Sequence, residues 1–508
     1  MILFLKSSSG DDTFLNLQVI VPSICQCYNV ITRNKANTKQ TQREVYMRKQ
    51  MRITALCLTA GMLLGSLAGC SGGSAEPTAA ASAAEQSASA TTAAADAAVQ
   101  GPVTLRMSWW GGDSRHEKIL AVIEAFQKEN PDITIEPEYS AFADYRDKFT
   151  MQLTSGAAAD ILAVDQPWVS TIMAQGDFFT DLSSYGELGL AEIDPYILNN
   201  FCKFDHGTFF MPTGVNGMGS LVDTESLEQY GFDSSNQNFT WDDLIALGEA
   251  VQAADPNQYL ACVDSKQAAL YYVRTYLRQL TGRQFINDDG TMGVTKEELS
   301  EALAFVNSLY EKGIFQPIEE SGIYENSMTQ NPAWINRKMF MILGRTSVMT
   351  DMSARRADAT GNYTTSGFLL PQLPNGKETG IEVRPTALYA VNKSCANPEA
   401  AAKFLAFMFN SEEGIELLKD TYSVPARESL RVYCEGKNIL DEAAMLNVEY
   451  SLANSGNVVN AWSNDSEVEA MMTEIIQKIA YKQYQDMGEA ADEVISRVGQ
   501  IVASSTKS

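Results

Sequence analysis

The chain has 508 residues, which predicts about three domain-sized units, or two large lobes with processed or linking segments. Apolar residues make up 45% of it and aromatic residues 9%, a composition that is typical of a folded soluble protein and excludes disorder for most of the chain. The 63 acidic residues outnumber the 38 basic ones and leave a net charge of −25, which disfavours binding to nucleic acid and to anionic membrane surfaces. Neutral solutes are the ligands that this charge accommodates most easily.

The histidine and cysteine content disfavours metal chemistry. The chain has only two histidines, His116 and His206, so the paired spacing of a zinc or copper site is missing. We therefore expect no metal and no cofactor. Four cysteines follow the predicted cleavage point without a C-x-x-C pattern, and they are Cys202, Cys262, Cys395 and Cys434. One or two disulfides and buried free thiols both remain open for them.

An export signal is predicted at residues 47–69. Basic residues after Met47 precede an apolar run from Ile53 to Leu64, which is too short for a membrane-spanning helix. The run ends in Leu67-Ala68-Gly69-Cys70, which resembles the lipobox of bacterial lipoproteins and implies that Cys70 is diacylated and becomes the mature N-terminus. Residues 1–46 have no place in such a signal, so we expect them to be a misassigned extension upstream of the true start at Met47 or Met51.

Residues 70–100 form the next segment and consist almost entirely of Ala, Ser, Thr and Gly. Such a composition cannot bury a core, so it predicts a disordered linker that holds a domain away from the membrane. Setting aside the 8 basic and 3 acidic residues of positions 1–69 leaves 30 basic and 60 acidic residues, so the exported part is still more acidic.

The first part of the predicted domain alternates strands and helices. Residues 103–109 alternate apolar side chains on one face, which predicts a strand, and Ser114 with Glu117 predicts a capping box for a helix that ends near residue 130. A strand near residues 133–135, a helix that ends at Gly156 and a buried strand at residues 160–164 follow. The order is βαβαβ, and ligands of such open sheets bind beyond the carboxyl ends of the strands.

Two loops at those strand ends carry similar chemistry. Trp109 and Trp110 precede Asp113 and Arg115 in the first loop. The second loop brings a further set of Asp165, Gln166 and Trp168, and Phe142 between the two loops is a further aromatic candidate. Indole rings stack on the apolar faces of sugar rings, while carboxylate, amide and guanidinium groups bind hydroxyls, so the two loops together predict a sugar site. The competing interpretation is that Trp109 and Trp168 are core anchors.

Further motifs resemble the extracellular solute-binding proteins of sugar ABC importers, the large family related to maltose-binding protein. The resemblance covers about residues 102–500. Its markers are Trp109 to Asp113, Phe126 to Ile135, Tyr145 to Leu153, Ser155-Gly156, Asp160-Ile161, Pro212 to Gly217, Thr240 to Leu244, and Asn397 to Leu405. The family usually has Pro where this chain has Ala159, a departure at the entry of one strand.

This resemblance implies an α/β fold with two lobes, a Venus flytrap, in which parallel-type sheets are flanked by helices. Lobe 1 is expected to comprise residues 101–213 and 336–386, and lobe 2 to comprise residues 214–335 and 387–508. The Pro- and Gly-rich segment from Pro212 to Gly219 is expected to be the first crossing between them, with Asn216 facing the cleft. A plain glycine-rich turn is the alternative for that segment.

The second half of the chain adds cleft candidates by the same resemblance. Residues 337–344 look like a return strand into lobe 1, which would bring Trp334 and Arg345 to the cleft rim, and residues 383–392 would carry the chain back past Arg384. An arginine there could bind a hydroxyl pair or a sugar acid, and a surface salt bridge is the equal alternative. Trp462 in a polar loop is a third aromatic candidate. The predicted ligand-binding residues are Trp109, Trp110, Asp113, Arg115, Phe142, Asp165, Gln166, Trp168, Asn216, Trp334, Arg384 and Trp462.

The sequence thus predicts a monomeric, lipid-anchored receptor on the extracellular face of a bacterial cytoplasmic membrane. It would bind a carbohydrate, with an oligosaccharide favoured, and deliver it to two permease subunits powered by a cytoplasmic ATPase. We expect no enzymatic activity and no nucleic-acid partner. The alternatives are a flytrap receptor for a peptide, polyamine or polyol phosphate, and a secreted glycosidase that uses a carboxylate pair.

Overall fold

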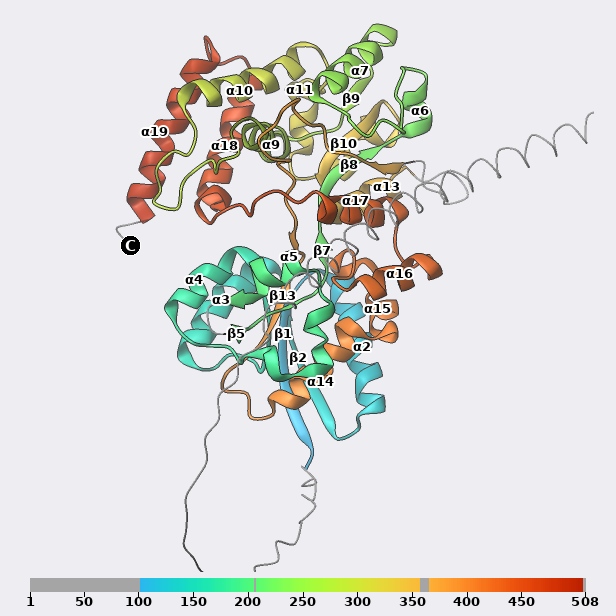
Figure 1. Cartoon of the computed structure of the whole chain (residues 1–508), viewed down its shortest axis with the longest axis vertical. Helices are drawn as coiled ribbons and strands as arrows, with labels where there is room; N and C mark the ends of the chain where they lie inside the picture. The colour runs from blue at the N-terminus through green and yellow to red at the C-terminus, as the bar shows by residue number, and fades with distance from the viewer. Residues whose placement is uncertain (1–100, 205–206, 357–364, 506–508) are drawn as a thin grey trace, which may run out of the picture. The chain divides into compact units, whose positions relative to one another are not determined.

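Two β-sheets organise the protein in a computed structural model that describes residues 101–204, 207–356 and 365–505 (Figure 1). The predicted signal peptide, Cys70 and the linker lie outside the described residues. The first sheet has the strand order β2-β1-β3-β13-β6. Its strands are β1 (Val103–Trp110), β2 (Ile133–Ser140), β3 (Ile161–Val164), β6 (Met211–Pro212) and β13 (Leu388–Val391). Strands β1, β2 and β3 are parallel, and β13 is antiparallel to both β3 and β6.

The second sheet has the order β11-β8-β10-β9. Its strands are β8 (Met218–Val222), β9 (Tyr259–Ala261), β10 (Met339–Arg345) and β11 (Ser366–Phe368). Strand β10 is antiparallel to β8 and parallel to β9, so both sheets are mixed rather than purely parallel. The elements around each sheet are called the first-sheet side and the second-sheet side below.

Helices flank both sheets (Figure 1). Those of the first-sheet side are α2 (Asp113–Glu129), α3 (Phe142–Ser155), α4 (Val169–Gln175), α5 (Pro195–Ile197), α14 (Pro398–Asn410) and α15 (Glu412–Leu418). The principal helices of the second-sheet side are α6 (Thr224–Glu228), α7 (Trp241–Ala254), α9 (Arg274–Thr281), α10 (Lys296–Glu311), α13 (Thr346–Ala354), α17 (Glu442–Ala453), α18 (Ser466–Ala480) and α19 (Met487–Ser505). Helix α16 (Glu428–Lys437) lies between α15 and α17 in the chain.

Alternation of apolar residues explains the central strand of the first sheet. Val103, Leu105, Met107 and Trp109 of β1 are all buried, as a period of two places them on one face. Strand β3 is apolar throughout and buried at every position, which suits a strand covered on both faces. Helix α3 ends at Gly156 with φ of 73°, the left-handed conformation that glycine adopts at a helix C-terminus, as the sequence predicts.

The predicted capping box of the first helix is wrong. Helix α2 begins at Asp113, one residue before Ser114, and its N-cap residue is Gly112, which has no side chain to accept a hydrogen bond. The signal in residues 114–117 is overridden because β1 extends to Trp110 and leaves only Gly111 and Gly112 for the turn into the helix.

Three segments connect the two sides. The chain leaves the first sheet at Pro212 and enters the second at Met218, through β7 (Val215–Asn216). It returns through β12 (Arg384–Pro385), which pairs antiparallel with β7, and then enters β13. The third connection runs through α16 towards α17, which packs against β8 and β11.

The predicted lobe boundaries need a correction at residues 336–386. We expected the strand at residues 337–344 to return to lobe 1, but β10 pairs with β8 and β9 of the second sheet. Residues 388–391, expected in lobe 2, form β13 of the first sheet instead, and the helices α14 and α15 that follow, also expected in lobe 2, pack on the first-sheet side. The strand of residues 337–344 carries no signal for this choice, because β10 is buried at every position and its apolar pattern fits either sheet.

The four cysteines of the described residues are all free and buried. Burial in apolar surroundings raises the pKa of the Cys202 and Cys262 thiols, so they behave as small core residues. Within the described ranges, no helix is both long enough and apolar enough to cross a membrane. The same residues hold no group of three His, Cys, Asp or Glu side chains that could bind a metal ion.

Candidate functional site

An aromatic patch lies at the carboxyl ends of β1 and β3 and consists of Trp110, Phe142 and Trp168. Trp110 ends β1, Phe142 begins α3, and Trp168 ends the short 3-10 turn that follows β3. Their ring centroids are 5.5 to 5.7 Å apart, and the rings of Phe142 and Trp168 are stacked. Phe142 is 43% exposed and the two tryptophans are half-buried. Three rings that keep exposed area form a surface on which an apolar ring face could pack.

Buried rings support the patch from below. Tyr145 and Phe149, one turn apart on α3, lie 6.4 Å and 5.6 Å from Trp168 between ring centroids. The Tyr145 hydroxyl donates a hydrogen bond of 2.8 Å to the carbonyl of Ala163 on β3, which anchors the helix to the sheet. Because these contacts hold the indole of Trp168 from the protein side, its other surface is pre-positioned for a ligand.

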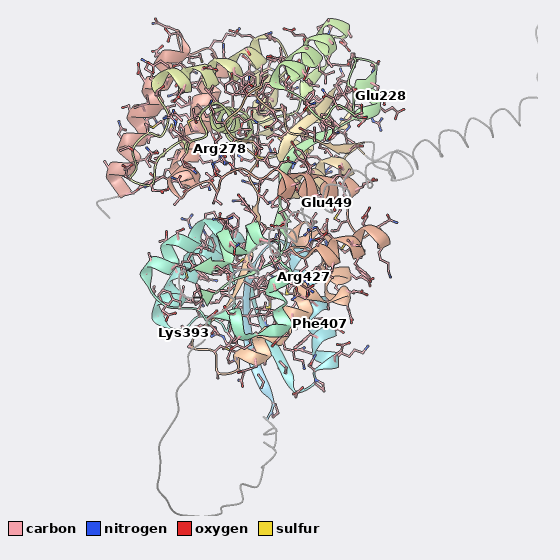
Figure 2. The ribbon with its side chains drawn as sticks, in the orientation of Figure 1. Glu228, Arg278, Lys393, Phe407, Arg427 and Glu449 are labelled. Carbon is pink, nitrogen blue, oxygen red and sulfur yellow. The ribbon has the colours of Figure 1, made fainter. Side chains whose placement is uncertain are left out.

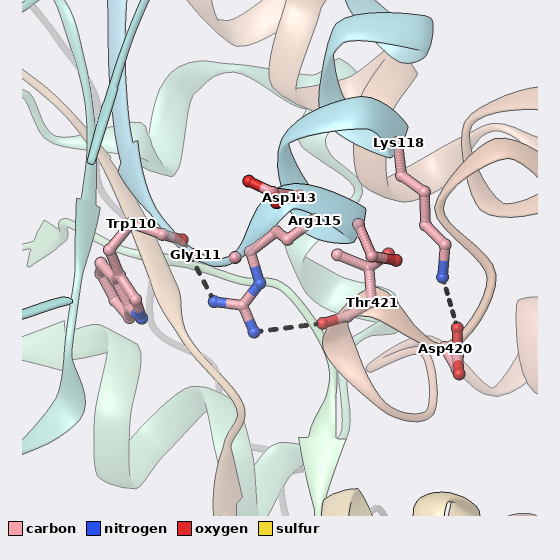
Figure 3. A pocket seen from close by; sticks show the side chains of 9 residues that line it. Trp110, Gly111, Asp113, Arg115, Lys118, Asp420 and Thr421 are labelled. Atoms are coloured by element: carbon pink, nitrogen blue, oxygen red, sulfur yellow. Dashed lines mark hydrogen bonds and ion pairs between the residues drawn. The ribbon is translucent and has the colours of Figure 1, made fainter. Parts of the chain in front are cut away.

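A large open hollow adjoins Trp110 and has a volume of about 570 Å³ (Figure 3). Arg115 lies in it, with its guanidinium donating to the carbonyls of Trp110 and Thr421 at 3.3 Å and 3.4 Å and stacking over the Tyr422 ring at 5.0 Å. Gly111 permits this position, because a Cβ there would lie 2.6 Å from Arg115 Cδ. Asp113 is exposed on the wall of the hollow.

A second, small hollow lies between the two sides of the fold. Its lining residues are Gln166, Tyr196, Phe201, Arg345, Glu382, Val383, Arg384, Asn457, Val458, Val459 and Asn464. They come from the loop after β3, from α5 and the π-helical segment Leu198–Cys202, from the end of β10, from the β12 connection, and from the loop between α17 and α18. The cavity volume is about 20 Å³, room for about one water molecule.

The segment from Asp165 to Trp168 links the patch and the small hollow. Gln166 lines the hollow, whereas Trp168, two residues on, belongs to the patch. Burial raises the pKa of Asp165, and the positive charge of Arg384 opposes that shift. The structure therefore brings together the predicted residues Trp110, Phe142, Asp165, Gln166, Trp168 and Arg384.

Buried charges surround Glu382 on the second-sheet side. Glu382 forms ion pairs with Arg274 at 2.9 Å and with Arg345, and Arg278 Nη1 lies 3.7 Å from it. Arg278 also binds Glu378 through two nitrogens, at 2.6 and 3.1 Å. Burial alone would raise the pKa of Glu382, but the positive charges of four arginines lower it to about 2, namely those of Arg274, Arg345, Arg278 and Arg384. Figure 2 labels Arg278 among the helices of this side.

Two predicted tryptophans are core residues, and the expectation that they line a cleft is wrong. Trp109 is fully buried and donates through Nε1 to His116 Nδ1 at 3.1 Å. It shares the inward face of β1 with Met107, so the strand alternation excludes it from the surface. Trp334 is also fully buried and donates to the Met352 carbonyl at 3.0 Å, in the apolar cluster behind β10.

Two more candidates have structural partners. Asn216 is buried in β7, where its amide donates to Ser347 Oγ and its carbonyl accepts from the Ser347 backbone N–H, both at 3.1 Å. The donor and the acceptor of the Asn216 side chain thus both hold the start of α13 against β7. The expectation that Asn216 faces a ligand is wrong. Trp462 is half-buried against the core.

Sequence reasoning missed Arg274, Arg278, Glu378, Glu382 and Tyr196. A signal existed for four of them. Arg274 and Arg278 are four residues apart in a helical stretch that is otherwise apolar on that face, and Glu378 and Glu382 have the same separation. Arginines at buried helix positions require buried acidic partners, so the two equally spaced pairs could have predicted this ion cluster.

Comparisons with known proteins agree with this architecture. The family model described as bacterial extracellular solute-binding protein matches residues 112–415. A binding protein of Brucella abortus is 23% identical over 296 residues, which cover 57% of this chain and 68% of that protein. A maltooligosaccharide ABC transporter solute-binding lipoprotein of Streptococcus pneumoniae is 25% identical over 310 residues, covering 58% of this chain and 65% of that protein.

A solved structure extends the likeness to the whole described fold. A periplasmic oligogalacturonide-binding protein from Yersinia enterocolitica, in complex with saturated digalacturonic acid, superposes with a TM-score of 0.67 at 22% identity. The match covers 79% of this chain and 99% of that structure. The fold is therefore the α/β fold of periplasmic solute-binding proteins, with mixed sheets flanked by helices. Because the family model matches well over half of the chain, the protein belongs to the bacterial extracellular solute-binding proteins, which bind small solutes for ABC transporters and are not enzymes.

Proposed function

We propose that this protein is the substrate-binding lipoprotein of an ABC importer and that its solute is a carbohydrate, with an oligosaccharide favoured. The observation that carries the proposal is the aromatic patch of Trp110, Phe142 and Trp168 at the carboxyl ends of parallel strands. Aromatic rings that keep one surface exposed suit the apolar faces of pyranose rings, and Asp165 and Gln166 beside them supply acceptors and donors for hydroxyls. The maltooligosaccharide-binding relative supports the same solute class.

Capture would proceed by closure of the two sides over the solute. The β7 and β12 pair connects the sides, with Arg384 opposite Asn216 and Pro385 opposite Val215. A two-stranded connection can absorb small backbone rotations in few residues, as hinges of binding proteins do. A ligand that contacts both sides stabilises the closed form by its differential affinity, and that form would be presented to two permease subunits powered by a cytoplasmic ATPase.

The anchor proposed for the receptor is a diacyl group on Cys70. A Cys70→Ser variant expressed from Met47 in a bacterial host should be released into the medium or periplasm, whereas the unchanged protein should partition with membranes. Membrane retention of the variant would contradict the lipid anchor without touching the solute assignment.

Thermal stability against a solute panel tests the carbohydrate assignment. Residues 97–508 group into one compact unit that includes the apolar core, so this part is the material for the test. A saccharide at 100 times its dissociation constant should stabilise it by about 2.7 kcal/mol. We expect a shift in melting temperature with one set of saccharides and none with polyols, peptides or polyamines. A response to peptides or polyamines alone would retain the receptor and overturn the carbohydrate.

Matched variants locate the site. Trp168→Ala and Trp110→Ala should each weaken saccharide binding by about tenfold or more, equivalent to about 1.4 kcal/mol. Tyr481→Ala is the control, because Tyr481 is an exposed aromatic residue (48%) at the end of α18, outside both hollows. Equal affinities in all three variants would exclude the patch as the site. Chromatography of the saccharide after incubation should show no breakdown, which separates this proposal from a glycosidase.

A further inference from the structure

The buried charges around the small hollow do not balance. Four arginines, Arg274, Arg278, Arg345 and Arg384, are accompanied by three carboxylates, those of Glu378, Glu382 and Asp165. The side chains of the first three arginines and of Glu382 are at most 9% exposed. One positive charge is therefore left over in a site from which most water is excluded.

Donor groups in this cluster also lack acceptors. Among the described residues, Arg274 Nε, Arg278 Nη1 and Arg345 Nη1 are buried and have no hydrogen-bond partner. The Arg384 side chain forms no hydrogen bond or ion pair within the described part of the chain, and the negative charge that acts on it most strongly is that of Asp165. The positive charge of Arg345, together with burial, lowers the pKa of Arg384 to about 10. Unpaired buried donors and two repelling guanidiniums are costly unless an anion joins them.

Two arginines of the cluster line the hollow: Arg345, which keeps a buried Nη1 without a partner, and Arg384, whose side chain has no hydrogen bond or ion pair among the described residues. Arg278 is bound in bidentate fashion by Glu378, and Glu378 also accepts from the Asn457 backbone at 2.9 Å, so this pair fixes the loop between α17 and α18. Arg345 and Arg384, in contrast, both line the hollow, together with Glu382. Arg345 pairs with Glu382 through Nη2 only, so donor groups of the two lining arginines remain available to a ligand in the hollow.

Two π-helical segments border the same site. Phe201, in Leu198–Cys202, lines the hollow, and Tyr271, in Ala268–Val273, interacts electrostatically with both Arg345 and Arg384. Single π-helical turns are rare and are frequently found at functional sites. Tyr196, Phe201, Val383 and Val459 add apolar or aromatic walls, which would suit the ring of a sugar beside a charged group.

We propose that the solute carries a carboxylate group and that the small hollow binds it between Arg345 and Arg384, so that the transported carbohydrate is an acidic saccharide built from sugar acids. This inference rests on the proposed carbohydrate function and adds the chemical class of the sugar. A carboxylate matches the planar fork of a guanidinium in bidentate geometry. The single negative charge of a carboxylate would balance the one excess positive charge of the cluster, whereas a phosphate monoester carries about −1.5 to −2.

The hollow is so small that the two sides must separate before the sugar acid can enter it. A volume of about 20 Å³ is too small for a carboxylate with its sugar ring. Gln166, Tyr196 and Phe201 come from the first-sheet side, and Arg345 and Asn457 to Asn464 from the second, so a hinge motion at β7 and β12 would widen it. The carboxylate would then be bound by the second-sheet side and the connection, while the aromatic patch binds ring faces from the first-sheet side.

Calorimetric titration of residues 97–508 with matched sugars tests the proposal. Each neutral oligosaccharide of glucose or galactose is compared with the corresponding oligomer of its uronic acid, and a sugar phosphate is included, all at one ionic strength. We expect the acidic saccharide of one pair to bind at least about tenfold more tightly than its neutral counterpart. Arg384→Gln should abolish that preference by weakening the acidic saccharide at least about tenfold more than its neutral counterpart.

The control variant is Arg355→Gln, which removes the same charge from an exposed position at the end of α13. Arg384→Lys keeps the charge without the fork and should give an intermediate affinity, which keeps the test informative if Arg384→Gln unfolds. Equal binding of neutral and acidic sugars, a preference for the sugar phosphate, or equal behaviour of the Arg384 and Arg355 variants would overturn the acidic solute while leaving the carbohydrate receptor in place. Binding of peptides or polyamines and of no saccharide would overturn both proposals.

Discussion

The hydroxyl of Tyr196 donates a hydrogen bond of 3.0 Å to the backbone carbonyl of Gly456, a residue 260 positions further along the chain. Tyr196 belongs to α5 of the first-sheet side, and Gly456 lies in the loop between α17 and α18 of the second-sheet side. Burial raises the pKa of Tyr196 to about 12, so its hydroxyl remains a donor at neutral pH. The bond thus ties the two sides at the edge of the small hollow.

Tyr196→Phe should favour the open form of the unliganded protein. The substitution removes one hydrogen bond between the two sides, which is worth about 1 kcal/mol, or a factor of about five in the equilibrium between closed and open forms. Small-angle X-ray scattering should show a larger radius of gyration. Tyr230→Phe is the control, since the Tyr230 hydroxyl bonds Gln258 at 2.8 Å within the second-sheet side. An unchanged radius in Tyr196→Phe would show that this bond does not restrain opening.

Trp334→Ala should reduce stability without affecting solute affinity. Trp334 is fully buried and packs under the Arg356 guanidinium at 4.4 Å, so its removal leaves a cavity and should lower the free energy of unfolding by about 3–5 kcal/mol. Urea denaturation measures this loss, and calorimetry at a temperature where the variant is folded measures affinity. Trp168→Ala should instead weaken solute binding while lowering the free energy of unfolding less than Trp334→Ala does. A loss of affinity in folded Trp334→Ala would place that residue in the site after all.

Asp223→Asn should destabilise the second-sheet side through the same cluster. Asp223 and Arg356 form an ion pair in which both side chains are inaccessible to solvent, and Arg356 also donates to the Met339 carbonyl at 2.7 Å. Breaking a buried pair leaves an uncompensated charge and costs about 3–5 kcal/mol. Because Arg356 contacts both residues, the effects of Asp223→Asn and Trp334→Ala should not be additive in a double-mutant cycle. Strict additivity would mean that the two contacts act independently.

Stability should fall in acid because of Glu382. Its pKa is lowered from 4.5 to about 2 in the folded protein, so the folded state favours the ionised form. The stabilisation is fully present above about pH 4.5 and is lost progressively as the pH falls towards 2. Urea unfolding between pH 7 and pH 2 should show this loss, and Glu382→Gln, although less stable at pH 7, should show a shallower slope in that window. Glu117→Gln, at an exposed position of α2, is the control and should keep the slope of the unchanged protein.

Local patterns in the sequence were sufficient for the architecture around the patch. The βαβαβ order placed the ends of β1 and β3 at one sheet edge, and Trp110 and Trp168 do lie 5.7 Å apart between ring centroids. The same alternation that predicts β1 also places Trp109 on the inward face with Met107, so its burial was available from the strand period. The ends of parallel strands are adjacent whatever the rest of the chain does, which is why this part of the site was predictable.

Strand pairing beyond neighbouring elements could not be predicted. Strand β10 is buried at every position, so its composition agrees with either sheet, and only backbone hydrogen bonds to β8 and β9 decide where it lies. This is why residues 336–386 were predicted to belong to lobe 1 although β10 lies in the second sheet. Trp334 was misplaced for the same reason, since its position beside a cleft depended on that strand.

Composition, periodicity and motif order predicted an acidic α/β protein of the solute-binding kind, with two tryptophan-bearing loops at one edge of its first sheet. The tertiary structure alone decided that Trp334 is covered, and it assembled Arg274, Arg345 and Arg384 around Glu382 from distant segments. Net charge is a sum over the whole chain and carries no positions, so an acidic protein can hold a local excess of positive charge. That excess depends on contacts between residues far apart in sequence, and such contacts exist only once the chain has folded.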